Sequence, residues 1–335
     1  MGTGLVAAID GGGTKTLFVI ARIDGAVLGV GHGGALNTVF VPTEVARASV
    51  RKAAAEACRV AGFGEHIPVQ VDALYVGAPG FSSDLALTSL DGLVQAAKLT
   101  VAADTLSAFV GALVEPFGVV ALAGTGSFAT GFNRAGECLT LGGWGALLGD
   151  EGSAYDIGLS ALRAVVRASE GRAAPTVLTD MILGEWRLAR VRDLVGTVYK
   201  AGPSRERIAG AAKIVSRAAE VGDGVAKGIL KRAGEDLGAL AVHVLSRLDL
   251  TGQQAPVALT GGVSRAGADL HDAFANTVQE ADPGCRIVKP RFSPAHGALL
   301  LALRSAGVRT EPAILERLDE TSAGFDWRRN GDNAG

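Results

Sequence analysis

One pattern occurs twice in this 335-residue chain: an apolar run, a turn of glycine and hydroxyl residues, and two further apolar runs. The apolar runs are residues 5–9, 17–23 and 26–30 in the first copy and 118–123, 128–132 and about 138–141 in the second. Runs of strand length separated by glycine turns predict an antiparallel meander. The repeat therefore predicts two similar lobes with a cleft between them.

Each meander is followed by segments with helical and strand patterns. The expected elements are helix 43–61, strand 73–76, helix 84–97, strand 99–103 and helix 105–114 in the first half, and a helical block at 153–248, strand 257–260, helix 264–280 and a buried helix at 294–303 in the second. Their alternation implies parallel strands joined by crossover helices. We expect an α/β chain with one lobe at 1–114 plus about 294–308, a second at 115–293, and a loosely ordered tail at 309–335.

Glycine is the compositional anomaly, with 47 of 335 residues, about twice its average share. Only 11 prolines accompany it, and no collagen period is present. This composition suggests many tight turns and close contacts between backbone and ligand. It argues against a coiled coil, a helical repeat array and a disordered chain.

Charge and cysteine content point to a cytoplasmic protein with small-molecule partners. Lys and Arg (32) nearly balance Asp and Glu (34), so we expect no nucleic-acid partner. The uncharged stretch from Pro116 to Asn133 is interrupted by glycines, and no signal peptide is apparent, so we expect no membrane association. Three scattered cysteines, Cys58, Cys138 and Cys285, suggest a reducing compartment.

The glycine turns are candidate phosphate-binding loops, because their backbone N–H groups can approach a ligand without side chains in the way. The residues expected to contact a nucleotide are Asp10, Gly12, Gly13, Thr14 and Lys15 in the first turn, Gly124, Thr125, Gly126 and Ser127 in the second, and Gly261 and Gly262 in a third. The P-loop pattern GxxxxGK[ST] is absent, and a strand follows the first turn where a P-loop needs a helix. A plain glycine hairpin is the alternative for the first turn taken alone.

These motifs resemble those of the sugar-kinase/actin/heat-shock ATPase superfamily, in which two duplicated ribonuclease-H-like lobes close on ATP. Its two phosphate motifs match DGGGTKT and LAGTGS, and its adenosine motif matches LTGGV at 259–263. Within it the chain is similar to the N-acetylglucosamine kinases and the related BadF/BadG/BcrA/BcrD-type ATPases, through LGGWGALLGDEGSAYDIG at 141–158. The resemblance covers about residues 5–305. It implies an ATP-dependent kinase acting on the 6-hydroxyl of N-acetylglucosamine or glucosamine, and a homodimer.

Two aspartates are the candidates for phosphoryl-transfer chemistry. Asp104 follows the apolar run 99–103 and opens a helix, and the resemblance implies that it takes the proton from the sugar hydroxyl. Helix N-capping is the alternative role, and both can hold. Asp10 beside a triphosphate is repulsive unless a cation lies between, which implies Mg²⁺ held through water. The five histidines show no metal-binding spacing.

The sugar site is carried over from the resemblance. It implies that Asn37 and Asp150 bind sugar hydroxyls, and that Gly143, Trp144 and Gly145 line the sugar. A core tryptophan is the alternative for Trp144. In the resembled family the position matching Gly210 approaches the nucleotide.

Two other classes share these nucleotide motifs. An ATP-driven activator of a 2-hydroxyacyl-CoA dehydratase would need cysteines for a bridging iron–sulfur cluster, and the three present show no suitable pairing. A ROK-type sugar kinase would carry a cysteine-rich zinc motif, which this sequence lacks. The sequence leaves the acceptor open among N-acetylglucosamine, N-acetylmannosamine, N-acetylmuramic acid, glucosamine and glucose.

Overall fold

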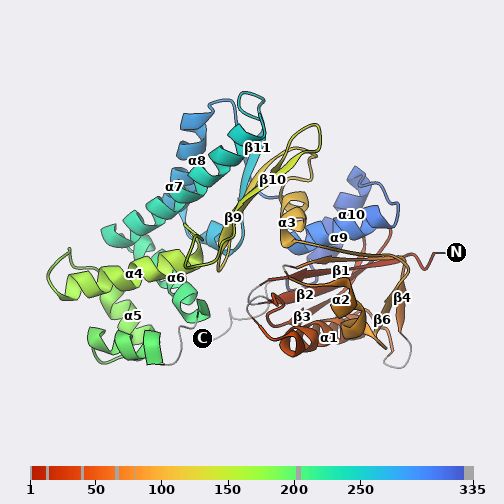
Figure 1. The fold of residues 1–335 in the computed structure, drawn as a ribbon, viewed down its shortest axis with the longest axis horizontal. Coiled ribbons are helices and arrows are strands. Elements are labelled where there is room, and N and C mark those ends of the chain that lie inside the picture. Colours follow the sequence, from red (N-terminus) through yellow and green to blue (C-terminus); the bar gives the residue numbers. More distant parts are fainter. Residues whose placement is uncertain are drawn as a thin grey trace. The chain divides into compact units, whose positions relative to one another are not determined.

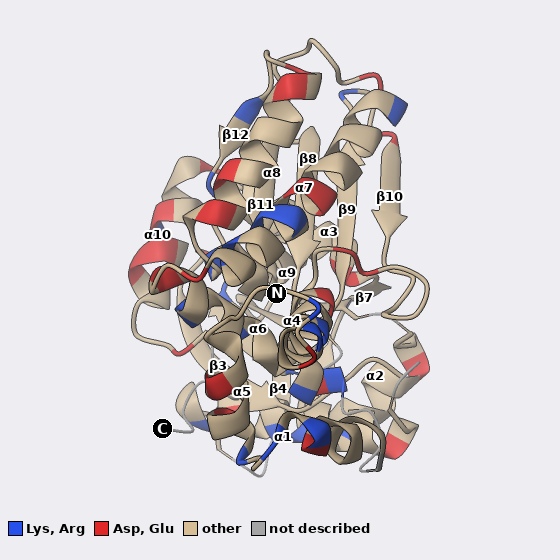
Figure 2. Cartoon of the chain, turned by 90° about the vertical axis from the view of Figure 1, so that its left-hand side faces the viewer, with Lys and Arg blue, Asp and Glu red and all other residues tan. Residues whose placement is uncertain are grey.

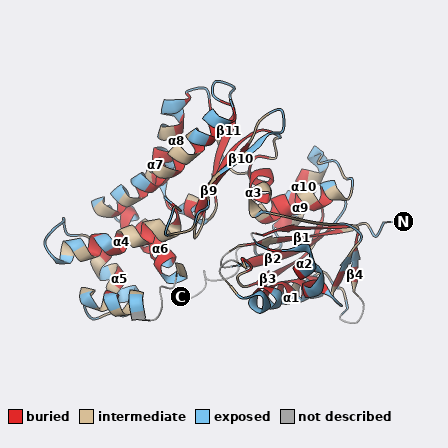
Figure 3. Cartoon of the chain, in the orientation of Figure 1, coloured by how far each residue is buried: buried red, intermediate tan, exposed pale blue. Residues whose placement is uncertain are grey.

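The computed structural model describes residues 2–12, 15–38, 41–64, 68–78, 80–200 and 205–327. The chain divides into two compact units (Figure 1). Unit 1 comprises Met1–Val114 and Arg291–Gly335, and unit 2 comprises Glu115–Pro290. Each unit has its own five-stranded sheet and its own buried core, which lies on the strands and the inward faces of the helices (Figure 3).

The sheet of unit 1 has the strand order β3-β2-β1-β5-β7. Its strands are β1 (Leu5–Gly11), β2 (Thr16–Arg22), β3 (Val27–Gly33), β5 (Ala73–Gly77) and β7 (Leu99–Ala102). The first three form an antiparallel meander, and β5 and β7 run parallel to β1. The meander predicted from the glycine turns is therefore confirmed.

Helices cover both faces of this sheet. Helix α1 (Thr43–Val60) packs on one face, which also carries α2 (Ser83–Leu90), and α3 (Asp104–Leu113) and α9 (Pro294–Ser305) lie on the other (Figure 1). Helix α9 contacts β1, β5 and α3, so a segment far along the chain completes unit 1.

The sheet of unit 2 repeats this plan with the order β10-β9-β8-β11-β12. Its strands are β8 (Gly118–Ala123), β9 (Ser127–Phe132), β10 (Cys138–Gly142), β11 (Pro256–Thr260) and β12 (Arg286–Val288). Strands β8 to β10 are antiparallel, and β11 lies parallel to β8 and β12. The two sheets thus share one topology, which confirms the duplicated α/β fold.

The helical block of unit 2 consists of several elements. They are α4 (Ala154–Ser169), α5 (Leu178–Trp186), the 3₁₀ turn η1 (Val191–Asp193), the π-helix η2 (Gly196–Lys200), α6 (Arg205–Glu220) and α7 (Gly224–Arg247), followed after β11 by η3 (Gly262–Arg265) and α8 (Ala268–Ala281). Positions of Lys and Arg are interspersed with positions of Asp and Glu along the helices (Figure 2). None of the described helices combines the length and apolar character that crossing a bilayer requires.

Two expectations differ from the structure. The helix expected at 84–97 ends at Leu90, and Val94–Ala96 instead form strand β6, which pairs with β4 (Val69–Val71) in a separate two-stranded sheet. The cause is the turn after Leu90, where Gly92 has a φ of 75° that a helix cannot continue through.

The expectation of a loosely ordered tail from residue 309 is wrong as far as Trp327. Residues Pro312–Ser322 form helix α10, which buries Leu315 and Leu318. Beyond it, the Trp327 ring stacks on His296 of α9 with ring centroids 3.7 Å apart, and its indole N–H donates to the Ser322 carbonyl. The polar composition concealed a helix with a narrow apolar stripe.

Candidate active site

Asp10 and Asp104 lie at the same edge of the unit 1 sheet. Asp10 is near the carboxyl end of β1 and pairs in register with Gly77 of β5. Asp104 is the first residue of α3, directly after β7, the strand that neighbours β5. Ligands in open α/β sheets bind at the carboxyl ends of parallel strands, so both carboxylates occupy the edge where a site is expected.

The environment of the two carboxylates raises the pKa of both. Burial, the largest cause, and the negative charge of Asp104 together raise the pKa of Asp10 to about 7, while the positive charge of Lys15 opposes the change. Burial also raises the pKa of Asp104 to about 6, opposed by a hydrogen bond from its own backbone N–H. The alternative capping role of Asp104 is not seen, because the N-cap of α3 is Ala103 and no side chain caps this helix.

A cation fits this pair. Among the described residues no group of three or more His, Cys, Asp or Glu side chains could hold a metal ion alone. Mg²⁺ takes most of its ligands from water and substrate phosphates, and needs only one or two carboxylates. The negative charge of Asp104 raises the pKa of Asp10 and the positive charge of Lys15 lowers it, so a further cation beside Asp10 would favour its ionised form.

The first glycine turn of unit 1 is described only at its ends, since Gly13 and Thr14 lie outside the described residues. Gly12 N–H donates to the Lys15 carbonyl at 3.0 Å, which closes the turn. The Gly12 carbonyl accepts from Leu36 N–H and Asn37 N–H, so the turn and the buried Asn37 are held together.

The second glycine turn belongs to unit 2 and is bound to the start of α4. Gly124 N–H donates to Gly126 O, and the Gly124 carbonyl accepts from Ala154 N–H. Ser127 uses both of its donors within the protein, since its N–H donates to Asp150 Oδ1 and its hydroxyl to the Glu151 carbonyl.

Asp150 is buried and lies beneath this turn. Its Oδ2 accepts from Arg205, the first residue of α6, at 2.5 Å, while Oδ1 accepts from Ser127 N–H. A Cβ at Gly126 would lie 2.7 Å from Oδ2, so glycine is required for the turn to approach the carboxylate. The expected sugar ligand is therefore also a structural anchor of the loop.

The segment between β10 and α4 exposes large apolar side chains. Trp144 is 73% exposed, Leu147 93% and Leu148 79%. The flanking Gly143 and Gly145 have φ values of 74° and 84°, which non-glycine residues rarely adopt. The core interpretation of Trp144 is therefore wrong, and its indole face is open.

The third turn ends β11. Gly261 has a φ of 94°, and a Cβ there would overlap the carbonyl oxygen of Ala123 at the end of β8. Gly262 begins η3, and the Ser264 hydroxyl donates to the Gly261 carbonyl. Gly210 lies on the exposed face of α6, and no described atom lies within 4 Å of the position that a Cβ would take, so no packing requirement explains glycine there.

Two residues of these sites were not expected from the sequence. Tyr75 lies within the strand expected at 73–76, and Arg205 follows a stretch without a recognisable motif, so neither was singled out. In the structure the Arg205 guanidinium donates a hydrogen bond to the Asp150 carboxylate. The Tyr75 phenol is buried, and burial together with the charges of Asp104 and Asp10 raises its pKa to about 12.

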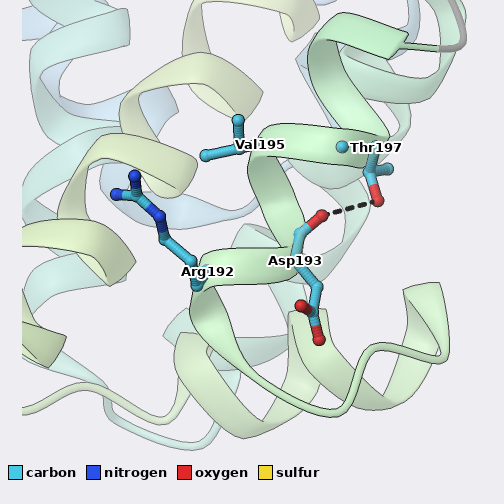
Figure 4. A pocket seen from close by; sticks show the side chains of 5 residues that line it. Arg192, Asp193, Val195 and Thr197 are labelled. Carbon is cyan, nitrogen blue, oxygen red and sulfur yellow. Dashed lines mark hydrogen bonds between the residues drawn. The ribbon is translucent and has the colours of Figure 1, made fainter.

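An open hollow of about 600 Å³ lies elsewhere in unit 2 (Figure 4). It is lined by Arg192, Asp193, Val195, Gly196 and Thr197, and the Thr197 hydroxyl donates to the Asp193 carbonyl. None of the described residues expected to bind nucleotide or sugar lines it.

Curated relatives match nearly the whole chain. The N-acetylmuramic acid/N-acetylglucosamine kinase of Clostridium acetobutylicum is 28% identical over 301 residues, which cover 89% of this chain and 97% of the relative. The N-acetyl-D-glucosamine kinase of Dictyostelium discoideum is 30% identical over 309 residues, with the same coverage of 89% and 97%.

Solved structures are similar over comparable lengths. A candidate N-acetylglucosamine kinase of Chromobacterium violaceum has a TM-score of 0.69 at 27% identity, covering 89% of this chain and 98% of its own. A ROK family glucokinase of Streptomyces griseus has a TM-score of 0.59 at 17% identity, with 90% and 100% covered, and shares the fold. The model of one family matches residues 8–302, and the chain therefore belongs to the BadF/BadG/BcrA/BcrD ATPase family.

Proposed function

We propose that this protein is an ATP-dependent amino-sugar kinase that phosphorylates the 6-hydroxyl of N-acetylglucosamine or glucosamine. The observation that carries the proposal is the Asp10–Asp104 pair at the carboxyl edge of the unit 1 sheet. The likeness to relatives named as N-acetylglucosamine kinases, over 89% of the chain, supports the substrate class.

Asp104 is the proposed general base. With a pKa raised to about 6 it is mostly ionised at neutral pH, yet basic enough to accept a proton. As the sugar oxygen forms a bond to the γ-phosphorus, its proton passes to an Asp104 carboxylate oxygen. The bond from the γ-phosphorus to the β–γ bridging oxygen breaks, and that oxygen leaves on ADP.

Asp10 is the proposed anchor for Mg²⁺, through water. A bound Mg²⁺ would neutralise part of the negative charge on the phosphates of ATP. Lys15 is exposed next to the first glycine turn and can add positive charge on the same side. The turns at 10–16, 124–127 and 261–262, with Gly210, are the proposed nucleotide contacts, and backbone N–H groups are the donors expected there.

The proposed sugar contacts are Asn37, Asp104, Asp150 and the segment 143–145. The exposed indole of Trp144 offers an apolar wall for a sugar face or an acetyl methyl group. A carboxylate has about four lone-pair positions, so Asp150 can accept from a sugar hydroxyl while it keeps Ser127 and Arg205.

The alternative, an activator of a 2-hydroxyacyl-CoA dehydratase, has less support. Cys58 and Cys285 are buried and only Cys138 is exposed. The Cys285 thiol also donates to Asp282, and burial raises its pKa to about 12, which disfavours the thiolate that iron needs. One exposed cysteine per chain supplies too few thiolate ligands for an iron–sulfur cluster that bridges two subunits.

We further propose a cytoplasmic location and a homodimer. Three free cysteines support a reducing compartment. Size-exclusion chromatography with light scattering tests the dimer, and a mass of one chain, 34.0 kDa, would contradict it.

The function is tested by coupled ADP release with N-acetylglucosamine, N-acetylmannosamine, N-acetylmuramic acid, glucosamine and glucose as acceptors. We expect an amino sugar to be preferred and its 6-deoxy analogue to be inert.

Asp104→Asn should lower kcat by about 10²–10⁴-fold and leave the affinity for ATP unchanged. Asp84→Asn, an exposed carboxylate in the first turn of α2, is the matched control. ADP release that no sugar accelerates, or normal turnover by Asp104→Asn, would reject the proposal.

A further inference from the structure

Asp150 lies in the turn that joins the exposed segment 143–149 to helix α4. Its φ of 63° is in the left-handed region, which aspartate adopts more readily than most residues but which still strains a residue with a Cβ. Its carbonyl accepts from the N–H of Ser153, the residue whose hydroxyl caps α4. The start of α4 therefore holds the Asp150 backbone, and the Asp150 side chain is buried.

Two donors from different elements hold the Asp150 carboxylate. Ser127 N–H, at the start of β9, donates to Oδ1 at 3.2 Å. The Arg205 guanidinium, at the start of α6, donates to Oδ2 at 2.5 Å through Nη2. Because each oxygen has its own donor, the carboxylate cannot rotate about its Cβ–Cγ bond without losing the geometry of both hydrogen bonds.

Gly126 of the second glycine turn lies directly against this ion pair. A Cβ there would lie 2.7 Å from Asp150 Oδ2 and 3.0 Å from Arg205 Nη2. The Arg205 side chain is only 25% exposed. The guanidinium is therefore enclosed between the turn and the carboxylate, and has little freedom to move away from Asp150.

Stability alone is a weak reason for an ion pair in this place. Buried ion pairs often add little to stability, because the cost of removing two charges from water cancels most of their attraction. The turn also has other supports, since Gly124 N–H donates to Gly126 O and the Gly124 carbonyl accepts from Ala154 N–H. A planar guanidinium is well suited to fixing the orientation of a carboxylate.

The orientation of Asp150 matters because of what lies beside it. Gly149, the preceding residue, packs against the exposed Trp144, since a Cβ at Gly149 would lie 3.3 Å from Trp144 Cβ. Asp150 thus follows directly on the segment proposed to line the sugar. Its carboxylate has about four lone-pair positions, and the donors from Ser127 and Arg205 use two of them.

We propose that Arg205 is a positioning residue of the sugar site, which orients the Asp150 carboxylate so that its remaining lone pairs accept from a sugar hydroxyl. The role rests on the proposed function, because it requires that Asp150 binds the sugar. Arg205 acts through Asp150 and touches neither the sugar nor ATP in this role.

The first test compares Arg205→Met and Arg205→Lys, with Arg217→Met as the matched control. Arg217 also lies in α6 and forms an ion pair, with Glu185 at 2.7 Å, but both side chains are exposed. Arg205→Met should raise the KM for N-acetylglucosamine about 10–100-fold, as expected when a hydrogen bond to a charged group is lost, and leave kcat and the KM for ATP unchanged. Arg205→Lys should restore most of the affinity, because its ammonium keeps the charge and can donate to Oδ2.

A merely structural role would give a different pattern. A lower melting temperature of Arg205→Met with an unchanged KM for the sugar would overturn the inference. An equal rise in the KM for ATP would also overturn it, because Arg205 would then support the phosphate turn as a whole. If Arg205→Met does not fold, Arg205→Gln takes its place, since its neutral amide can still donate to Oδ2, and a smaller rise in the same KM is expected.

The second test asks whether Arg205 acts through Asp150. Isothermal titration calorimetry with N-acetylglucosamine measures the dissociation constants of Arg205→Met, Asp150→Asn and the double variant. Arg205→Met should weaken binding little further in the Asp150→Asn background, whereas effects that add in full would overturn the inference. If the wild type binds and phosphorylates no sugar, the proposed function fails and this inference with it. If the wild type is active and the Arg205 variants match it, only this inference fails.

Discussion

Asp10 gives unit 1 a pH-dependent stability. Its pKa is about 7 in the folded protein, mainly through burial, against 3.8 for the ordinary side chain. Between these values the folded chain holds a proton that the unfolded chain releases. The stabilising contribution is therefore fully present below about pH 4 and is lost as pH rises through about 7. Asp104, with a pKa of about 6, acts with the same sign.

The prediction at this position is that Asp10→Asn raises the melting temperature more at pH 8 than at pH 5. At pH 5 the folded carboxyl is neutral and only the first part of the destabilisation has developed, whereas at pH 8 all of it is present and the uncharged amide removes it. Differential scanning fluorimetry of both proteins at the two pH values measures the effect, with Asp84→Asn as the control. A lower melting temperature for Asp10→Asn at pH 8 would show that the Asp10 charge stabilises the ligand-free protein.

Two properties of single residues could not be predicted from the sequence. The GGWG segment was identifiable, but only the structure shows that Trp144 is exposed, because exposure depends on what packs nearby. Tyr75 lies within an apolar strand pattern, which gives no signal that its buried hydroxyl lacks a hydrogen-bond partner in the described part of the chain. Both properties arise from tertiary contacts that periodicity does not encode.

At the scale of elements, glycines control how closely α1 approaches the meander. A Cβ at Gly29, Gly31 or Gly33 of β3 would overlap a carbonyl oxygen of α1. These three positions alternate along the strand, so they present one flat face to the helix. A part of the glycine excess therefore serves packing between a helix and a strand, and has no part in ligand contact.

Gly31→Ala should lower the free energy of unfolding by about 1–3 kcal/mol or more, since the new methyl group overlaps the Ala53 carbonyl oxygen. Gly228→Ala is the matched control. Gly228 is exposed within α7 with no close neighbour, so alanine should stabilise by about 0.5–1 kcal/mol. Urea unfolding measures both values, and equal effects at the two positions would contradict this account of β3.

The longer elements were predictable and the shortest were not. The repeat of glycine turns and apolar runs indicated both meanders, and the structure confirms them. Strands β4, β6 and β12 have three residues each, which is too short for a periodic pattern. Helix α10 was missed because its apolar stripe is narrow among charged residues.

At the scale of the whole molecule, unit 2 is an insertion in unit 1. The chain leaves unit 1 after Val114 and returns at Arg291. Helix α9 then buries a continuous run of residues from Ala295 to Leu300 against β1, β5 and α3. Unit 1 is therefore incomplete without its second segment, whereas unit 2 is continuous in sequence.

A fragment of residues 115–290 should fold, and a fragment of residues 1–114 should not. The first keeps its entire sheet and helices, while the second lacks α9 and exposes one apolar face of its sheet. Circular dichroism melts test this, with a cooperative transition expected only for 115–290. Adding residues 291–327 through a short linker to 1–114 should restore cooperativity. A cooperative melt of 1–114 alone would contradict the role given to α9.

The contact between α3 and α9 has a consequence for protein synthesis. Gly111 and Gly297 let the two helix backbones touch, since a Cβ at either would overlap the other helix. The helix that begins with Asp104 is thus braced by one that begins only at Pro294, after the whole of unit 2. A nascent chain carries both aspartates long before the ribosome makes that brace. A chain whose synthesis stops within unit 2 therefore contains Asp10 and Asp104 but lacks the helix that holds the start of α3.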